Sequence, residues 1–199
     1  MLAHRRGWVF DMDGTLTHAI HDFVAIKREL GLPEDRPILE VLSEMDAARA
    51  APIARRLDEI EYEIAGRATA AIGAVSLLRA LRDAGAHLGV LTRNTRRNAL
   101  LTLEVTGLLP FFEVDDILGR DEAEPKPSPS GVARLLSRWG CDPSRAVMAG
   151  DYLFDLQAGR AAGVATVYVD GSGVFPFGEL ADIQVVSLDQ LLPLFETPN

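Results

Sequence analysis

Two carboxylates two residues apart, Asp11 and Asp13, follow a short apolar run at residues 8–10 and precede Gly14. An apolar run of this length is typical of a buried strand in a parallel sheet. A strand that ends in Asp-x-Asp-Gly places acidic side chains at its carboxyl end, and ligands bind at that end of the strands in open α/β sheets. The glycine allows a tight turn, so that backbone N–H groups can face a bound anion. The pattern therefore indicates a candidate site at the end of this strand.

Such a pair of carboxylates can carry out two-step chemistry on a phosphate ester. One carboxylate beside a divalent cation can attack phosphorus and become an aspartyl phosphate. A second carboxylate close by can hold a proton, because two like charges in one site raise the pKa of one of them. That proton can pass to the leaving oxygen, and the same group can later activate water. Taken alone, the pattern also fits a strand followed by a turn with solvated acids, so the remaining segments decide.

The segment after Thr17 shows the periodicity of helices and no strand pattern. Its apolar residues recur in three stripes, namely Phe23, Ile26 and Leu30; Ile38, Val41, Leu42 and Met45; and Leu57, Ile60 and Ile64. Gly31 and Pro33 end the first helix, and Pro37 suits the first turn of the second. The third helix carries acids on its other faces, namely Asp58, Glu59, Glu61 and Glu63. Three amphipathic helices in a row predict a small helical unit over residues 18–70, inserted after the first strand.

From residue 71 onward, strand and helix patterns alternate. Strands are expected at residues 87–91, 112–118, 146–149 and 164–169. A helix with a stripe of Val75, Leu78 and Leu81 is expected before them, and further helices between them. Three prolines make residues 124–129 a loop, and Ser128 is expected to cap the helix that follows. The alternation predicts an α/β fold, a Rossmann-like parallel sheet with helices on both faces, made of residues 1–17 and 71–199.

Four further polar residues fall at the ends of expected strands or in nearby loops. Thr92 follows the strand at residues 87–91, Lys126 lies in the proline-rich loop, and Asp151 and Asp155 follow the strand at residues 146–149. With Asp11 they supply what phosphoryl transfer requires, which is a nucleophile, hydroxyl and ammonium groups for phosphate oxygens, and carboxylates for a cation. An all-oxygen ligand set favours Mg²⁺, and the sequence has no His/Cys cluster for zinc.

These segments resemble the four motifs of the haloacid dehalogenase superfamily, in its phosphatase branch. Residues 11–17, Asp-Met-Asp-Gly-Thr-Leu-Thr, are similar to the first motif, DxDGT[LV]. Leu91-Thr92 is similar to the second, residues 126–129 (Lys-Pro-Ser-Pro) to the third, and residues 150–155 (Gly-Asp-Tyr-Leu-Phe-Asp) to the fourth, GDxxxD. The resemblance runs from about Trp8 to the C-terminus and excludes the helical insert, which matches in position more than in sequence.

The resemblance implies a role for each acidic residue of these motifs. Asp11 would be the nucleophile and a metal ligand. Asp13 would be the acid/base, with its backbone carbonyl on the metal. Asp151 would complete the Mg²⁺ site, and Asp155 would bind the metal through water or orient Lys126.

The resemblance also implies a phosphate-binding set, made of Thr92, Arg93, Asn94 and Lys126. The Thr92 hydroxyl would bind a phosphate oxygen with help from nearby backbone N–H groups, and Lys126 would neutralise the phosphate and the nucleophile. The insert stands where the superfamily carries a C1-type helical cap, which closes over the sheet and selects the substrate. His18 and His21, three residues apart at the entry to the insert, are candidates for substrate contact, although a solvated helix start is the favoured interpretation of both.

The composition excludes several other classes of function. The chain has 199 residues and a net charge of −9, and it shows no dense run of Lys or Arg of the kind that binds nucleic acid. It has one cysteine, Cys141, so an intrachain disulfide is impossible, which fits a reducing compartment. No apolar run is long enough for a signal peptide or a membrane span. We expect a cytoplasmic protein, a monomer or weak homodimer, whose partner is a small phosphorylated metabolite.

The sequence therefore predicts a Mg²⁺-dependent phosphatase for a small phosphomonoester, similar to phosphoglycolate phosphatases. A phosphomutase acting on sugar phosphates would share every core motif and differ in the cap. Dehalogenation is less favoured, because it does not need an acid at the position of Asp13. A phosphate-binding protein that keeps the fold without turnover would be expected to have lost Asp11, Asp13, Lys126 or Asp151, and the sequence has all four.

Overall fold

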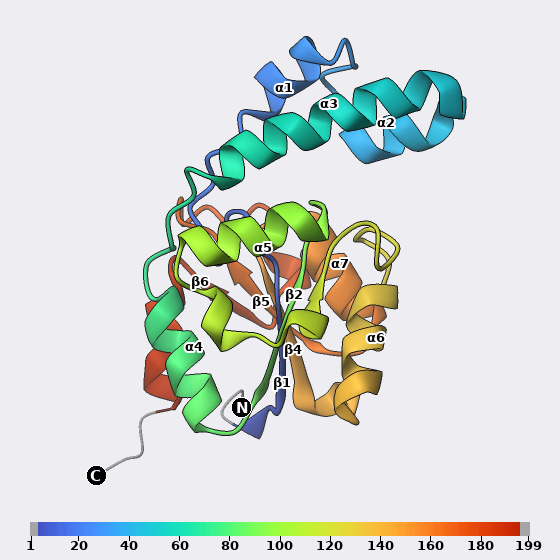
Figure 1. The fold of residues 1–199 in the computed structure, drawn as a ribbon. Coiled ribbons are helices and arrows are strands. Elements are labelled where there is room, and N and C mark those ends of the chain that lie inside the picture. Colours follow the sequence, from blue (N-terminus) through green and yellow to red (C-terminus); the bar gives the residue numbers. More distant parts are fainter. Residues whose placement is uncertain (1–3, 196–199) are drawn as a thin grey trace.

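Six parallel strands form one sheet in the computed structural model, which describes residues 4–195 (Figure 1). The strands are β1 (Gly7–Phe10), β2 (His87–Leu91), β3 (Ile117–Leu118), β4 (Ala146–Gly150), β5 (Ala165–Val169) and β6 (Ile183–Val185). Their order across the sheet is β3-β2-β1-β4-β5-β6, so β1 lies in the middle. All four residues of β1 are buried, as expected for an apolar strand covered on both faces.

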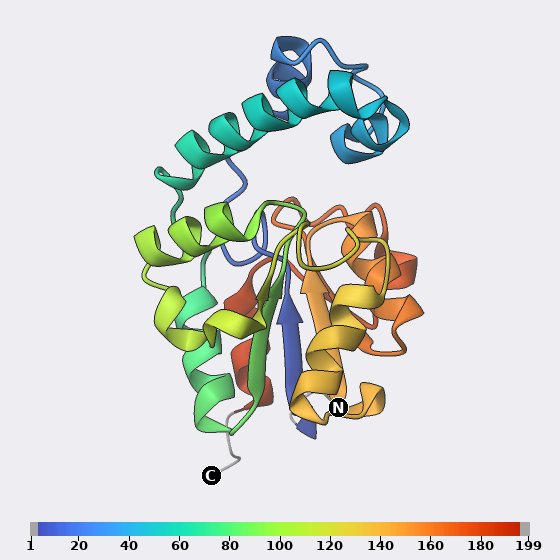
Figure 2. The ribbon, with the colours of Figure 1, turned by 45° about the vertical axis from the view of Figure 1, so that its right-hand side comes forward.

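Helices cover both faces of this sheet (Figure 2). On one face, α4 (Ala74–Asp83) and α5 (Arg96–Val105) pack with a C-terminal 3₁₀ segment, η6 (Leu188–Leu194), over an apolar cluster that includes Trp8 and Phe10. On the other face lie α6 (Ser130–Trp139) and α7 (Leu153–Ala161). Shorter 3₁₀ turns connect these elements, namely η2 (Leu109–Phe111), η3 (Val114–Asp116), η4 (Pro143–Arg145) and η5 (Gly178–Leu180). The α/β arrangement with two covered faces agrees with the predicted fold class.

Three helices stand beyond the carboxyl ends of the strands, namely α1 (Phe23–Glu29), α2 (Ile38–Glu44) and α3 (Ala47–Ala65) (Figures 1 and 2). They pack around an apolar cluster of their own, which includes Ile26, Val41 and Leu57. The chain leaves the core and returns to it through two adjacent segments, because Thr17 and Ala70 form an antiparallel bridge and His18 N–H donates to the Thr69 carbonyl at 3.0 Å. None of the helices in the described range is both long and apolar enough to cross a membrane.

The structure differs from the expected elements at several positions. The strand expected at residues 112–118 is reduced to the two residues of β3, because residues 114–116 turn as a 3₁₀ segment in which Val114 is exposed. Strand β6 is not apparent from the sequence, since it is a three-residue edge strand with a mixed burial pattern. In α4 the buried stripe contains Leu77, while Val75 is exposed. Helix α6 has Pro129 at its N-cap, one residue later than the cap expected from the sequence.

Candidate active site

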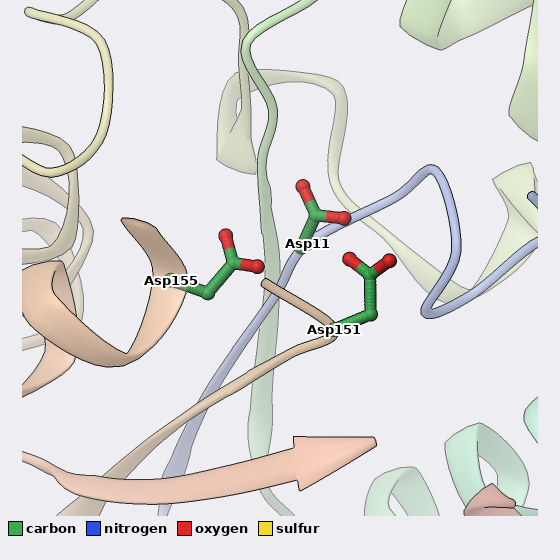
Figure 3. Close-up of side chains that lie close together, drawn as sticks. All are labelled: Asp11, Asp151 and Asp155. Carbon is green, nitrogen blue, oxygen red and sulfur yellow. The ribbon is translucent and has the colours of Figure 1, made fainter. Parts of the chain in front are cut away.

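Three aspartates converge at the carboxyl ends of the central strands. Asp11 follows β1, Asp151 follows β4, and Asp155 lies in the first turn of α7. One carboxylate oxygen from each lies within 4.8 Å of the others, and the side chains point toward a common space (Figure 3). Strands β1 and β4 are paired in register, and the Asp11 N–H donates to the Ala149 carbonyl at 2.8 Å, which fixes the first two acids side by side.

Two glycines allow the loops that carry these acids to approach one another. Gly14 has a φ of 95°, a conformation that L side chains rarely adopt, and a Cβ there would overlap the Asp151 carboxylate. A Cβ at Gly150 would overlap the side chain of Asp155. Both glycines are therefore required by close packing, and Gly14 is required by its backbone conformation as well.

Lys126 joins two of these acids. Its ammonium group donates a hydrogen bond to Asp11 and lies 2.7 Å from a carboxylate oxygen of Asp155, and its side chain is 1% exposed. Burial alone would lower the pKa of Lys126, but the two neighbouring carboxylates raise it above its ordinary value. The lysine therefore keeps its positive charge inside the site.

Burial, with a smaller effect of neighbouring carboxylates, raises the pKa values of two of these acids. Burial raises the pKa of Asp11 to about 7 even though Lys126 acts in the opposite direction. Burial, with the nearby charges of Asp11 and Asp155, raises the pKa of Asp151 to about 9. A cation that binds between these carboxylates would reverse that cost, because it favours their charged forms. The oxygen donors and the uncompensated charge fit a divalent cation such as Mg²⁺.

Asp13 lies apart from this cluster and has different neighbours. Burial raises the pKa of Asp13, while His21 and the side-chain amide of Asn94 act to lower it. His21 Nδ1 lies 3.9 Å from an Asp13 oxygen. The Asn94 carbonyl oxygen accepts hydrogen bonds from the Thr95 N–H at 2.9 Å and from the Asn98 amide at 3.1 Å, which leaves its NH₂ group for Asp13. Burial therefore raises the pKa of Asp13 above its ordinary value, against the effects of these two neighbours.

The structure brings the expected phosphate-binding residues to the same place, but the Arg93 side chain takes another direction. The Thr92 hydroxyl is buried and accepts a hydrogen bond from the Asn94 N–H at 3.1 Å. The Arg93 guanidinium donates to the Lys126 carbonyl and binds both carboxylate oxygens of Glu40 in α2, at 2.8 and 2.7 Å. Arg93 therefore links the core to the helices above it.

A second arginine makes another link of this kind. Arg120 donates to Glu61 at 2.9 Å and to Asp58, both in α3, and to the Arg93 carbonyl at 3.2 Å. The sequence places Glu61 on an outer face of its helix, but it is buried at this contact. Burial raises the pKa of Glu61 to about 7 although Arg120 acts to lower it. No spacing in the sequence distinguishes Glu40 or Arg120 from ordinary surface charges.

The residues of the four motifs line a single cavity of about 410 Å³. The haloacid dehalogenase-like hydrolase family matches the chain over residues 6–163. The chain belongs to this family. It is therefore an enzyme of the haloacid dehalogenase-like hydrolases, and the resemblance inferred from the motifs is confirmed.

Curated relatives extend the match beyond these motifs. The pyrophosphatase PpaX of Bacillus velezensis is 32% identical over 177 residues, which cover 81% of each chain. The phosphoglycolate phosphatase of Caulobacter vibrioides is 32% identical over 185 residues, which cover 80% of this hydrolase and 77% of the relative. Among solved structures, CbbY from Rhodobacter sphaeroides in complex with phosphate superposes with a TM-score of 0.76 at 23% identity, over 94% of this hydrolase and 96% of CbbY. The likeness to CbbY supports the fold.

Proposed function

We propose that this hydrolase is a Mg²⁺-dependent phosphatase that cleaves a small phosphomonoester through an aspartyl phosphate on Asp11, in the manner of phosphoglycolate phosphatases. One observation carries the proposal. The Asp11 carboxylate is held by Lys126 at the floor of a cavity that also contains Thr92, Asp13 and Asp151. A nucleophile, an ammonium group, a hydroxyl group, a second acid and a cation-binding carboxylate are thus within reach of one phosphoryl group.

In this proposal Asp11, Asp151 and the backbone carbonyl of Asp13 hold Mg²⁺, with Asp155 in support. The ion, when bound, would neutralise the charge of the phosphoryl group and of the nucleophile. Asp155 also contacts Lys126 at 2.7 Å, so it keeps the ammonium group beside Asp11.

The two aspartates of the first motif then divide the work. An oxygen of Asp11 attacks phosphorus, and the bond between phosphorus and the ester oxygen breaks as Asp13 gives that oxygen its proton. In the second step Asp13 takes a proton from a water molecule, whose oxygen attacks the same phosphorus. The bond between phosphorus and the Asp11 oxygen breaks, so inorganic phosphate leaves and the Asp11 carboxylate is restored. The Thr92 hydroxyl and Lys126 hold the phosphoryl oxygens throughout.

We further propose that residues 18–70 act as a cap that closes the cavity and selects the leaving group. The two curated relatives are named as a pyrophosphatase and as a phosphoglycolate phosphatase, so their names indicate different substrates.

The single cysteine, Cys141, supports a cytoplasmic location.

Turnover of a panel of phosphate esters with Mg²⁺ tests the proposal. Release of inorganic phosphate from at least one ester is expected for the wild type, and none for Asp11→Asn, because an amide is a poor nucleophile. Isomerisation of a sugar phosphate without release of phosphate would instead indicate the phosphomutase alternative. Binding of phosphate without any turnover would indicate a non-catalytic protein.

A further inference from the structure

The cavity above the carboxylates is larger than a phosphoryl group requires. Its volume of about 410 Å³ lies in the range of sites that take drug-sized ligands. Asp11, Asp13 and Lys126 line one end of it, and the cap helices line the other. The phosphate ester of a two-carbon hydroxy acid would leave much of this space unfilled. The side chains that line the rest of the cavity therefore indicate the chemistry of the alcohol that the substrate carries.

Apolar side chains predominate on those walls. The cap contributes Phe23, Ile38, Leu39 and Leu57, and the core contributes Tyr152 and Phe154. Phe23 and Tyr152 are 52% and 50% exposed, so about half of the surface of each residue is accessible. The Tyr152 ring stands edge-on to Phe154 and Phe177, with centroids at 5.2 and 5.5 Å, and the Phe23 ring stacks on His21 at 5.4 Å. Both rings therefore pack against aromatic neighbours while each residue stays partly accessible.

The arginines that line the cavity are already paired with carboxylates. Arg36 binds Glu44 through two hydrogen bonds of 3.0 and 2.5 Å. Arg93 binds Glu40 through two hydrogen bonds and lies 4.5 Å from the centre of the Phe154 ring. Both guanidinium groups therefore already have a carboxylate partner within the protein.

The other charges of the cap wall balance one another. Lys27 lines the cavity and donates to the Glu34 carbonyl at 2.7 Å, and within residues 4–195 it has no carboxylate partner. Asp35 lines the same cavity and offsets its charge, whereas Glu61, which also lines it, is already paired with Arg120. The wall thus has little net positive charge with which to attract a carboxylate.

We infer that the preferred substrate, granted the phosphatase function proposed above, is a phosphomonoester whose alcohol has an apolar or aromatic body that packs between Phe23 of the cap and Tyr152 of the core. The phosphoryl group binds at Asp11 and the apolar body fills the space under α1 and α2. Binding energy for this alcohol comes from buried apolar surface rather than from an ion pair.

A comparison of three esters of primary alcohols tests the inference, namely benzyl phosphate, 2-hydroxyethyl phosphate and 2-phosphoglycolate. Benzyl phosphate is expected to have a kcat/KM about 10- to 100-fold above that of 2-hydroxyethyl phosphate, from burial of its ring. Phe23→Ala should lower this ratio roughly tenfold. Val24→Ala, at an exposed neighbour on α1 that does not line the cavity, is the matched control and should keep the ratio.

Two results would overturn the inference. One is equal turnover of the three esters. The other is a preference for 2-phosphoglycolate that is lost in Lys27→Met, because the cap would then select a carboxylate. Acetyl phosphate separates these failures from a failure of the proposed function, since its small activated leaving group needs no apolar wall. Hydrolysis of acetyl phosphate without a preference for benzyl phosphate refutes this inference alone, whereas no hydrolysis of any compound refutes the phosphatase function as well.

Discussion

The contact between Arg120 and Glu61 gives a quantitative test of how the cap is held on the core. Arg120 and Glu61 have side chains that are 11% and 10% exposed, and their charged atoms lie 2.9 Å apart. Asp58, the other partner of Arg120, is 47% exposed, so its share of the interaction is small. Arg120→Met removes the charge and keeps most of the side-chain volume, which leaves the Glu61 carboxylate buried without its cation.

Proton uptake by Glu61 limits the cost of this substitution. The folded-state pKa of Glu61, about 7, lies above its ordinary value of 4.5. The folded state therefore binds more protons than the unfolded chain between these values, and the free energy of unfolding falls as pH rises through this range. Without Arg120 the pKa rises further, and the fall continues above pH 7. Each pH unit above 7 then adds about 1.4 kcal/mol to the difference between wild type and variant.

We expect Arg120→Met to lower the free energy of unfolding, relative to the wild type, by about 1 kcal/mol more at pH 8 than at pH 6, and by about 3 kcal/mol more at pH 9. For a chain of this size, 3 kcal/mol corresponds to a fall in Tm of roughly 6–12 °C. Denaturant unfolding of both proteins at pH 6, 8 and 9 measures the difference directly.

Two further variants test whether the buried Glu61 carboxylate causes the pH-dependent loss of stability. Arg120→Met combined with Glu61→Gln has no buried carboxylate, so the pH-dependent part of the loss should disappear. Arg67→Met, at an exposed cap arginine that bonds the Glu63 carbonyl at 3.3 Å, should cost little at any pH. The reasoning is refuted if the free energy of unfolding lost in Arg120→Met is the same at pH 6 and pH 9. It is also refuted if this loss stays pH-dependent in the double variant, because the ion pair would then not account for the stability of this contact.

Three other outcomes follow from the proposed mechanism. EDTA should abolish phosphatase activity and Mg²⁺ should restore it, while Ca²⁺ should inhibit because of its larger and looser coordination shell; full activity after exhaustive chelation would contradict the metal site. With an aryl phosphate, whose good leaving group scarcely needs a proton, Asp13→Asn should still form a phosphoryl-enzyme on Asp11 and then stall, since hydrolysis of that intermediate loses roughly 10²–10⁴-fold without the base; mass spectrometry after acid quench should find the added phosphoryl group there and none in Asp11→Asn. Removal of residues 18–70 should leave a folded core with altered substrate ranking, measured as kcat/KM over the ester panel, and an unchanged ranking would place specificity in the core.

The core and the positions of the catalytic groups could be predicted because they depend on short-range patterns. The apolar run before Asp11 and Gly14 after it specify a buried strand and a tight turn within a few residues of one another. The alternation of strands and helices then fixes a parallel order, which brings Asp151 to the same edge of the sheet as Asp11.

The contacts between cap and core could not be predicted in the same way. Glu40 and Arg93 are 53 positions apart, and Glu61 and Arg120 are 59 positions apart. Each is an ordinary charged residue in its local sequence, and only the three-dimensional arrangement of α2 and α3 over the core pairs them. The edge strand β6 was missed for a related reason, since its place is set by pairing with β5 rather than by its own three residues.

The bridge between Thr17 and Ala70 has a consequence for how such enzymes can diversify. Because the insert leaves and rejoins the core at two neighbouring backbone positions, a change in its length need not move the two core segments that flank it. A different set of helices, or a longer one, can be spliced between these two positions without a change in strand register. If residues 18–70 select the substrate, as proposed above, replacing them at this junction with the corresponding segment of a relative should give hybrid enzymes that catalyse the same reaction on different esters.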